Sequence, residues 1–199
     1  MSVDIFKSMS KSGGFDLIIT HLPTSTRVSF PGFITRFSDS YSADFNSEKI
    51  YGRMDPIVTY NGTGRQIAAS FDVIAESIET AEENMQKFAI FSKMMYPKFA
   101  RVDKSDTMSL KAPPLLKIKY ANLIKDAFSD DGLVGAAQEA TMVPSFDHGF
   151  FAPVDLPGVL YAKKYTIDIS FEVLHVHQVG WDEKNKWLGG EDYPHSVPG

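Results

Sequence analysis

The sequence lacks several features that whole classes of protein need. None of its 199 residues is cysteine, which excludes disulfides, thiolate nucleophiles, iron–sulfur clusters and cysteine-ligated zinc. It has no run of about 18 apolar residues to form a membrane-spanning helix, and residues 1–7 do not resemble a signal peptide. Twenty basic against 25 acidic residues give a net charge of −5, which argues against a nucleic-acid-binding protein. We therefore expect a protein used in the cytosol or carried out of it within an assembly.

Motifs that would indicate an enzyme are also missing. The sequence has no phosphate-binding GxxxxGK[ST] loop, no GxSxG nucleophile turn and no HExxH metal motif. Asp130-Asp131-Gly132 resembles part of a calcium loop, but the alignment puts Ala127 and Gln138 at ligand positions. The sequence therefore predicts no catalytic residue, no metal site and no cofactor.

What the chain has in quantity is apolar and aromatic residues. Hydrophobic residues make up 43% of it and aromatic residues 13%, which is typical of a β-rich core or a large interface. The length suits one main domain. We predict an N-terminal arm at residues 1–14, a domain at 15–180 and an extended, polar C-terminal tail at 181–199.

Alternation of apolar and polar residues predicts strands along most of the domain. The expected strands are residues 15–19, 28–30, 33–37, 41–45, 57–60, 65–74, 116–120, 133–143 and 159–179. Residues 28–30 and 33–37 are either a strand pair or one bulged strand, because Pro31-Gly32 should prevent an uninterrupted central strand there. Asn61-Gly62 predicts a tight hairpin turn. The last strand would be the longest, at roughly 50 Å, and would place His175 and His177 on one face.

One helix is expected at residues 77–96. Ser77 or Thr80 can cap its start, and Pro97 should end it. Its core face is predicted to carry five apolar residues, namely Ile78, Ala81, Met85, Phe88 and Met95. Residues 101–108 are polar and predict a loop. Many strands with one helix, and no βαβ order, indicate an α+β fold that is mainly antiparallel β.

A few residue groups are candidates for chemistry. His175 and His177 have strand spacing that suits a metal, but a third ligand would have to come from elsewhere, such as His148 or His195. Two histidines at a wet strand end are therefore the simpler interpretation. Asp168 and Glu172 would lie about 13 Å apart, beyond the spacing of glycosidase carboxylates, which favours a solvated acidic stripe. Arg53 and Asp55 could clamp a ligand or pin a loop.

A longer pattern suggests a family. It comprises Tyr51-Gly52-Arg53-Met54-Asp55-Pro56-Ile57, then Tyr60, Thr63, Arg65 and Phe71, a helix with Ala81, Glu83 and Asn84 that ends at Met95-Tyr96-Pro97, the strand at Pro113-Pro114-Leu115-Leu116, and residues 165–176. Over residues 28–180 this pattern resembles the tail-tube-junction proteins of contractile-tailed phage baseplates, also called tube initiator or tube cap proteins. It consists of hydrophobic and turn positions and contains no catalytic signature.

The resemblance implies a tail-tube-like β-sandwich or small barrel with one flanking helix. It implies a structural virion protein of the tail baseplate, assembled in the host cytoplasm as a homohexameric ring. Such a ring would join the central hub protein to the tail tube protein and template tube polymerisation. DNA would pass through its lumen without specific binding, which the acidic net charge favours; no membrane is involved.

Under this interpretation, two groups of residues become candidates. Tyr51, Arg53, Asp55 and Arg65 are candidates for a subunit interface or for pinning a loop. Asp168 and Glu172, or Ser70 and Asp72, are candidates for the lumen face. The alternatives are another tail adaptor or terminator, a small-ligand-binding β-barrel with aromatics around a pocket, and a hydrolase that uses His175, His177 and an acidic residue.

Overall fold

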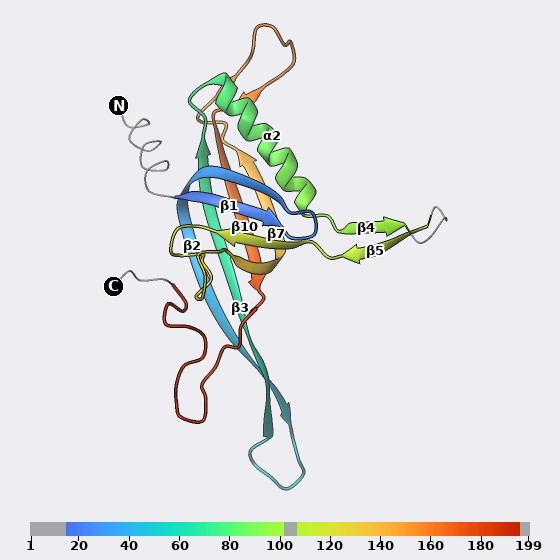
Figure 1. The fold of residues 1–199 in the computed structure, drawn as a ribbon, viewed down its shortest axis with the longest axis vertical. Coiled ribbons are helices and arrows are strands. Elements are labelled where there is room, and N and C mark those ends of the chain that lie inside the picture. Colours follow the sequence, from blue (N-terminus) through green and yellow to red (C-terminus); the bar gives the residue numbers. More distant parts are fainter. Residues whose placement is uncertain (1–14, 102–106, 196–199) are drawn as a thin grey trace.

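The computed structural model describes residues 15–101 and 107–195. The elements run β1 (Asp16–His21), β2 (Thr26–Glu48), β3 (Ile57–Ile74), α2 (Ile78–Met94), β4 (Lys98–Arg101), β5 (Met108–Ala112), β6 (Leu115–Lys119), β7 (Leu133–Pro144), β8 (Phe150–Phe151), β9 (Tyr161–Ala162) and β10 (Lys164–Val173). Figure 1 shows a central barrel with α2 along one side and two hairpins that project from it. The predicted arm at residues 1–14 lies outside the described residues.

Six strands close into a barrel in the order β1-β2-β3-β10-β7-β6, and each neighbouring pair is antiparallel. Their inward positions alternate along each strand, as period two requires. The inward residues include Leu17, Ile19, Phe30, Ile67, Phe71, Leu116, Ile118, Ile167 and Phe171, which are all fully or almost fully buried. The predicted fold class, mainly antiparallel β with one helix in the described part of the chain, is confirmed.

Of the two predicted arrangements the structure shows one bulged strand, because β2 runs through Pro31-Gly32 and its register shifts between Ile34 and Arg36. Asp16 to His21 pair with residues 26–31 of β2, whereas Gly32 begins the pairing with β3. Pro31 therefore lies where β2 changes from one neighbour to the other. A residue without an N–H is tolerated at such a changeover, where no second ladder bond is required of it.

The prediction of a tight hairpin turn at Asn61-Gly62 is wrong. β3 continues through both residues, and Asp44 pairs with Gly62 while Phe45 pairs with Tyr60. Asn61 is thus the additional residue of a β-bulge, an alternative use of a turn-forming residue within a strand. The actual connection between β2 and β3 lies at residues 49–56, where Gly52 has a φ of +84°.

The strand predicted at residues 159–179 is much shorter in the structure. β10 covers ten residues and ends at Val173, so His175 and His177 lie beyond it and share no strand face. Its predicted alternation is confirmed from Ile167 to Val173, where the inward residues are buried. The longest strands are β2, with 23 residues, and β3, with 18.

Helix α2 begins as expected at Ser77, whose Oγ accepts from the backbone N–H of Thr80 at 3.2 Å. The predicted core face is only partly correct. The buried residues are Ala81, Asn84, Phe88, Phe91 and Met94, whereas Ile78 and Met85 are exposed. Phe88 stacks on Phe30 of β2 with ring centroids 4.9 Å apart, which directs this face into the barrel core. Because the polar Asn84 lies within the buried face, the hydrophobic pattern did not predict which side of the helix is buried.

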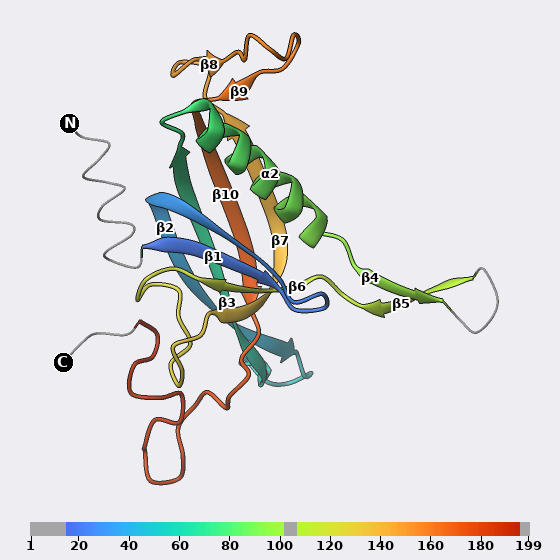
Figure 2. The same ribbon diagram turned by 45° about the horizontal axis from the view of Figure 1, so that its top comes forward.

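Two short sheets lie outside the barrel. β4 and β5 form a hairpin that leaves from the end of α2, and β8 and β9 pair near its start. The turned view in Figure 2 shows these two sheets at opposite ends of the helix. The loop predicted at residues 101–108 is flanked by strands that the sequence did not predict, and residues 102–106 lie outside the described part.

Candidate interaction surface on the projecting hairpin

The distal halves of β2 and β3 form a two-stranded ribbon that extends beyond the barrel (Figure 1). The pairing of β10 with β3 ends at Gln66, and β1 pairs with β2 only up to Pro31. From Tyr41↔Arg65 to Glu48↔Ile57, the two strands pair only with each other within the described residues. Eight residues of β2 and nine of β3, including the bulge residue Asn61, make this ribbon about 25 Å long. We call residues 41–48 and 57–65 the ribbon.

The ribbon has one apolar and one polar face. Side chains of cross-strand partners share a face, and alternate residues along a strand share it too. The mainly apolar face carries Tyr41, Ala43, Phe45, Val58 and Tyr60 together with Ser47, Thr63 and Arg65, and the mainly polar face carries Ser42, Asp44, Asn46, Glu48 and Thr59 together with Ile57. Because Arg65, Ile67 and Phe71 alternate on the same side of β3, the apolar face continues the inward face of the barrel.

Aromatic side chains stand out on this face. Phe45, Val58 and Tyr60 are 55%, 55% and 57% exposed. The rings of Phe45 and Tyr60 lie 5.5 Å apart, and the hydroxyls of Tyr60 and Thr63 are 2.6 Å apart. A two-stranded ribbon of this kind is marginally stable in water, so an exposed, ordered row of aromatics here is typical of a docking surface.

A buried ion pair anchors the base of the ribbon. Arg65 is 1% exposed, and its Nε and Nη2 donate to the Asp39 carboxylate at 3.0 and 2.7 Å. The guanidinium also lies 5.5 Å from the Tyr41 ring centroid and 5.3 Å from that of Tyr193. Removing either charge would leave the other buried without compensation, which is costly. The pair therefore fixes the point where the ribbon leaves the barrel.

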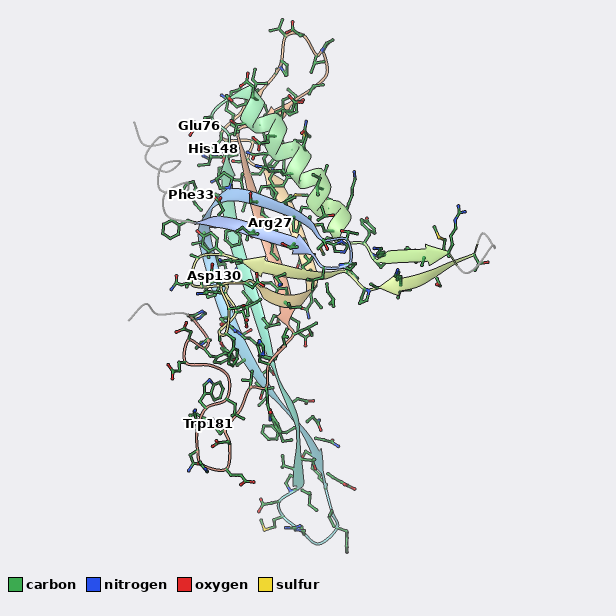
Figure 3. All side chains as sticks on the ribbon, in the orientation of Figure 1. Arg27, Phe33, Glu76, Asp130, His148 and Trp181 are labelled. Atoms are coloured by element: carbon green, nitrogen blue, oxygen red, sulfur yellow. The ribbon has the colours of Figure 1, made fainter. Side chains whose placement is uncertain are left out.

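The C-terminal segment is held at the same point. Arg65 Nη2 donates to the Pro194 carbonyl at 3.4 Å, and His195 Nε2 lies 3.5 Å from the Asp39 carboxylate. The Trp187 ring lies against Trp181 and Tyr193, which closes the segment into a loop. Figure 3 shows Trp181 on this loop, beside the upper part of the ribbon. The segment at 181–195 thus covers the proximal part of the apolar face and leaves Phe45 uncovered.

The pKa values of Tyr41 and His175 are shifted at the base of the ribbon. Loss of water around the Tyr41 hydroxyl raises its pKa above the usual value, the Arg65 charge opposes that rise, and the hydrogen bond that Tyr41 donates to Asp39 adds to it. Partial burial, and secondarily the positive charge of Arg65, lower the pKa of His175. Both residues are therefore neutral at pH 7, and the charge at the base resides in the Arg65–Asp39 pair.

The four predicted interface or loop-pinning residues occupy opposite ends of the ribbon. Arg65 lies at its base, next to the C-terminal segment. Tyr51, Arg53 and Asp55 lie in the connection at the tip, fully accessible or exposed. Asp39, Tyr41 and Tyr193, which complete the anchor, were missed, because no local pattern connects them with Arg65, from which they are 24 or more positions away.

The predicted lumen residues all lie on the outer face of the barrel. Ser70 and Asp168 are register partners on β3 and β10, and the Ser70 hydroxyl donates to the Asp168 carboxylate. Asp72 accepts from Thr166 at 2.8 Å and pairs with Lys164 at 2.8 Å. Glu172 is exposed on the same face. The face is solvent-accessible and polar, and its position in a lumen stays a prediction.

His175 and His177 line one hollow together with Asp126, but the structure brings no third metal ligand to them among the described residues. His177 lies against the Phe128 ring, 3.8 Å from the Asp126 carboxylate, and His148 contacts Ser145 elsewhere. Among the described residues, no three His, Asp or Glu side chains are grouped as metal ligands would be. Asp130 and Asp131 instead pair with lysines, at 2.9 Å to Lys119 and 3.0 Å to Lys117.

Space for a small ligand is found at the barrel mouth. A hollow of about 310 Å³ lies between the β6–β7 connection and the C-terminal segment, and its lining includes Arg65, Lys117, Asp126, His175 and Tyr193. The interior itself is filled by the inward side chains of the six strands. In the described ranges, no helix has the length and apolar character needed to cross a bilayer.

Comparisons with known proteins place the chain only loosely. No protein-family model matches it, and no curated protein is similar to it in sequence. Among solved structures it is similar to the Dit protein (gp 19.1) of phage SPP1, described as a paradigm of the hub adsorption apparatus in phages that infect Gram-positive bacteria. The match has a TM-score of 0.44 and 10% identity, and covers 82% of this chain and 52% of that one. The chain thus spans about half the length of that protein.

Proposed function

We propose that this protein is a structural subunit of a phage tail. Copies of it would form a homohexameric ring that joins the central hub to the tail tube and templates the tube. The observation that carries the proposal is the ribbon, a free two-stranded extension whose apolar face continues the barrel core into solvent. Such a face is stabilised when a neighbouring subunit covers it. The motif resemblance over residues 28–180 supplies the phage-tail context.

Three further features support a structural role. The barrel closes on itself, whereas among the described residues the projecting ribbon and the β4–β5 hairpin keep unpaired outer edges, which a neighbouring subunit could cover. The base of the ribbon is fixed by the buried Arg65–Asp39 pair, so the apolar face would be presented to a neighbour in one orientation. The sequence contains none of the catalytic motifs considered above, and in the described residues no three His, Asp or Glu side chains are grouped as metal ligands would be. We therefore propose that the chain is not an enzyme.

The outer face of β3, β10 and β7 suits a DNA channel. It carries Asp168 and Glu172 of β10 and Glu139 of β7, which pairs with Ser170 in the register. The same face also carries Arg36, which lies beside Asp168 and Glu139, and Lys164, which pairs with Asp72. Carboxylates on a channel wall would repel the phosphate backbone and allow DNA to slide. We propose this face as the wall of the lumen.

Quantitative mass spectrometry of purified tailed particles tests the function. About six copies per particle, far fewer than the main tube protein, would support a junction ring. Copies equal to the tube protein would identify the tube subunit, and a ring at the head-proximal end in labelled images would identify a terminator. Absence from intact particles would overturn the proposal and favour a ligand at the barrel mouth.

A further inference from the structure

We infer that the β4–β5 hairpin docks onto the solvent face of α2 in a second copy of this chain. The inference rests on the proposed ring and names a second pair of surfaces that would hold neighbouring subunits together. It is carried by an apolar and basic hairpin, an apolar and acidic helix face, and the distance between them within one chain.

The hairpin has an apolar face that its own chain leaves open. Phe99 pairs with Leu110, and Arg101 pairs with Met108, so these four side chains share one face. Phe99, Met108 and Leu110 are 54%, 60% and 62% exposed. Lys111 is the additional residue of a bulge between these pairs and the base of the hairpin. An isolated hairpin with three exposed large apolar residues is expected to rest on a partner.

The hairpin is also basic. Its described strands contain Lys98, Arg101 and Lys111 and no acidic residue. Lys98 is already used within the chain, since its Nζ donates to the Pro23 carbonyl at 3.0 Å. Arg101 and Lys111 are exposed and flank the apolar residues. The partner surface should therefore combine apolar contact area with negative charge.

The solvent face of α2 has this combination. Ile78, Glu82, Met85 and Ala89 follow one another at spacings of three or four residues, so they form one stripe along the helix. Ile78 and Met85 are 37% and 45% exposed. Glu79 lies in the first turn and Glu82 in the same half of the helix, whereas Glu83 is already paired with Lys87 at 2.8 Å. Figure 3 labels Glu76 at this end, just before the helix begins.

The β4–β5 hairpin cannot reach the solvent face of α2 in its own chain. It leaves from the C-terminal end of α2 and points away from the helix in both views (Figures 1 and 2). The acidic half lies at the other end of a 17-residue helix, which is about 25 Å long. Contact therefore requires another molecule. Both complementary surfaces belong to this chain, which identifies a second copy as the partner. A head-to-tail contact of this type generates a ring when its rotation closes.

Charge reversal on each surface gives a direct test. One variant carries Arg101→Glu and Lys111→Glu, and a second carries Glu79→Lys and Glu82→Lys. Each variant should self-associate more weakly, with a dissociation constant about ten times that of the unmodified chain. Sedimentation velocity and native mass spectrometry measure this change. A ring has about six times the 22.1 kDa mass of one chain. An equimolar mixture of the two variants should associate again, because each altered hairpin then meets an altered helix of opposite charge.

Controls separate this contact from general effects of charge. Lys184→Glu with Lys186→Glu makes the same charge change on exposed residues of the C-terminal segment and should leave association unchanged. Circular dichroism should show the same fold in all variants. If rings persist in both reversed variants, if the control dissociates equally, or if mixing restores nothing, the inference is wrong.

The outcome for the ring and the outcome for the function remain distinguishable. An unmodified chain that stays monomeric at all concentrations overturns this contact, while the copy number in particles still decides the proposed function. Rings that tolerate both charge reversals overturn the contact and leave the ring proposal in place. Phe99→Ser and Met85→Ser supply an uncharged second test, and each should weaken association without changing the melting temperature by more than about 2 °C.

Discussion

The same two strands form the core of the barrel and the exposed ribbon. In the barrel half of β3, Ile67, Phe71 and Val73 are fully buried. In the ribbon half, Val58 and Tyr60 alternate in the same way and are more than half exposed. The difference is that β10 pairs with the barrel half of β3 and ends before the ribbon half. Alternation thus defines a face, and neighbouring strands determine whether that face becomes core or interface.

The largest contrast should come from truncating an aromatic ring in each half. Phe71→Ala should lower the free energy of unfolding by about 4 kcal/mol, because it leaves a cavity in a closed core. Phe45→Ala in the ribbon removes a half-exposed ring and should cost less than about 1 kcal/mol. Urea denaturation of both variants measures the difference. Equal losses would mean that the ribbon is as integral to the fold as the barrel.

The second-largest loss of unfolding free energy should come from breaking the Arg65–Asp39 pair, which lies between the barrel and the ribbon. Arg65→Met leaves the Asp39 carboxylate buried without its partner, and we expect a loss of about 3 kcal/mol. The C-terminal segment should also become sensitive to protease, because Arg65 holds the Pro194 carbonyl. Adding Asp39→Leu should recover most of the stability. If proteolysis of the segment stays unchanged in Arg65→Met, the anchor does not hold it.

Two glycines, one in the barrel and one in the ribbon, differ in the space available for an added Cβ atom. A Cβ on Gly135 of β7 would lie 2.6 Å from both the Glu172 carbonyl oxygen and a Phe171 ring carbon, so Gly135→Ala should cost about 2 kcal/mol. A Cβ on Gly62 in the ribbon would meet nothing within 4 Å, and Gly62→Ala should be neutral or slightly stabilising. Thermal melting of the two variants distinguishes these outcomes.

A pH effect should arise in the barrel half. Burial, and then the charge of Lys98, lower the pKa of His21, whose Nδ1 is 2.8 Å from the Thr24 hydroxyl. The unfolded chain therefore binds a proton more readily than the folded one as the pH falls below about 6.5. Unfolding free energy should decrease over that range and be fully retained above it. His21→Gln should reduce this slope between pH 7.5 and 5.5, and an unchanged slope would contradict the assignment.

The smallest effect on stability should accompany a distinct effect on association. Tyr60→Ser removes an exposed ring from the ribbon, so the unfolding free energy should change by no more than about 0.5 kcal/mol. If a neighbouring subunit covers this face, the same change should weaken self-association. Sedimentation velocity measures that loss, and Thr59→Ala on the polar face is the matched control. Equal behaviour of both variants would place the interface elsewhere.

Much of the fold was predictable because it is encoded locally. The inward residues of β3, β6 and β10 follow from alternation alone, and Ser77 identifies the start of α2. The errors occurred where a local signal has two structural uses. Asn61-Gly62 can form a turn or a bulge, and a polar Asn84 within the buried helix face disguised its register. Residues 174–179 continue the alternation of β10, although that strand has already lost its partners.

Local sequence patterns are sufficient for the antiparallel β class, the inward faces of β3, β6 and β10 and the position of the helix, because these depend on residues a few positions apart. The choice of neighbouring strands, the change of partner of β2 at Pro31, and the contacts of Arg65 with Asp39 and Pro194 follow only from the three-dimensional arrangement. Closing a barrel depends on pairings between distant segments, and an alternating pattern is compatible with many such pairings. The ribbon exists because that closure stops short of the ends of β2 and β3.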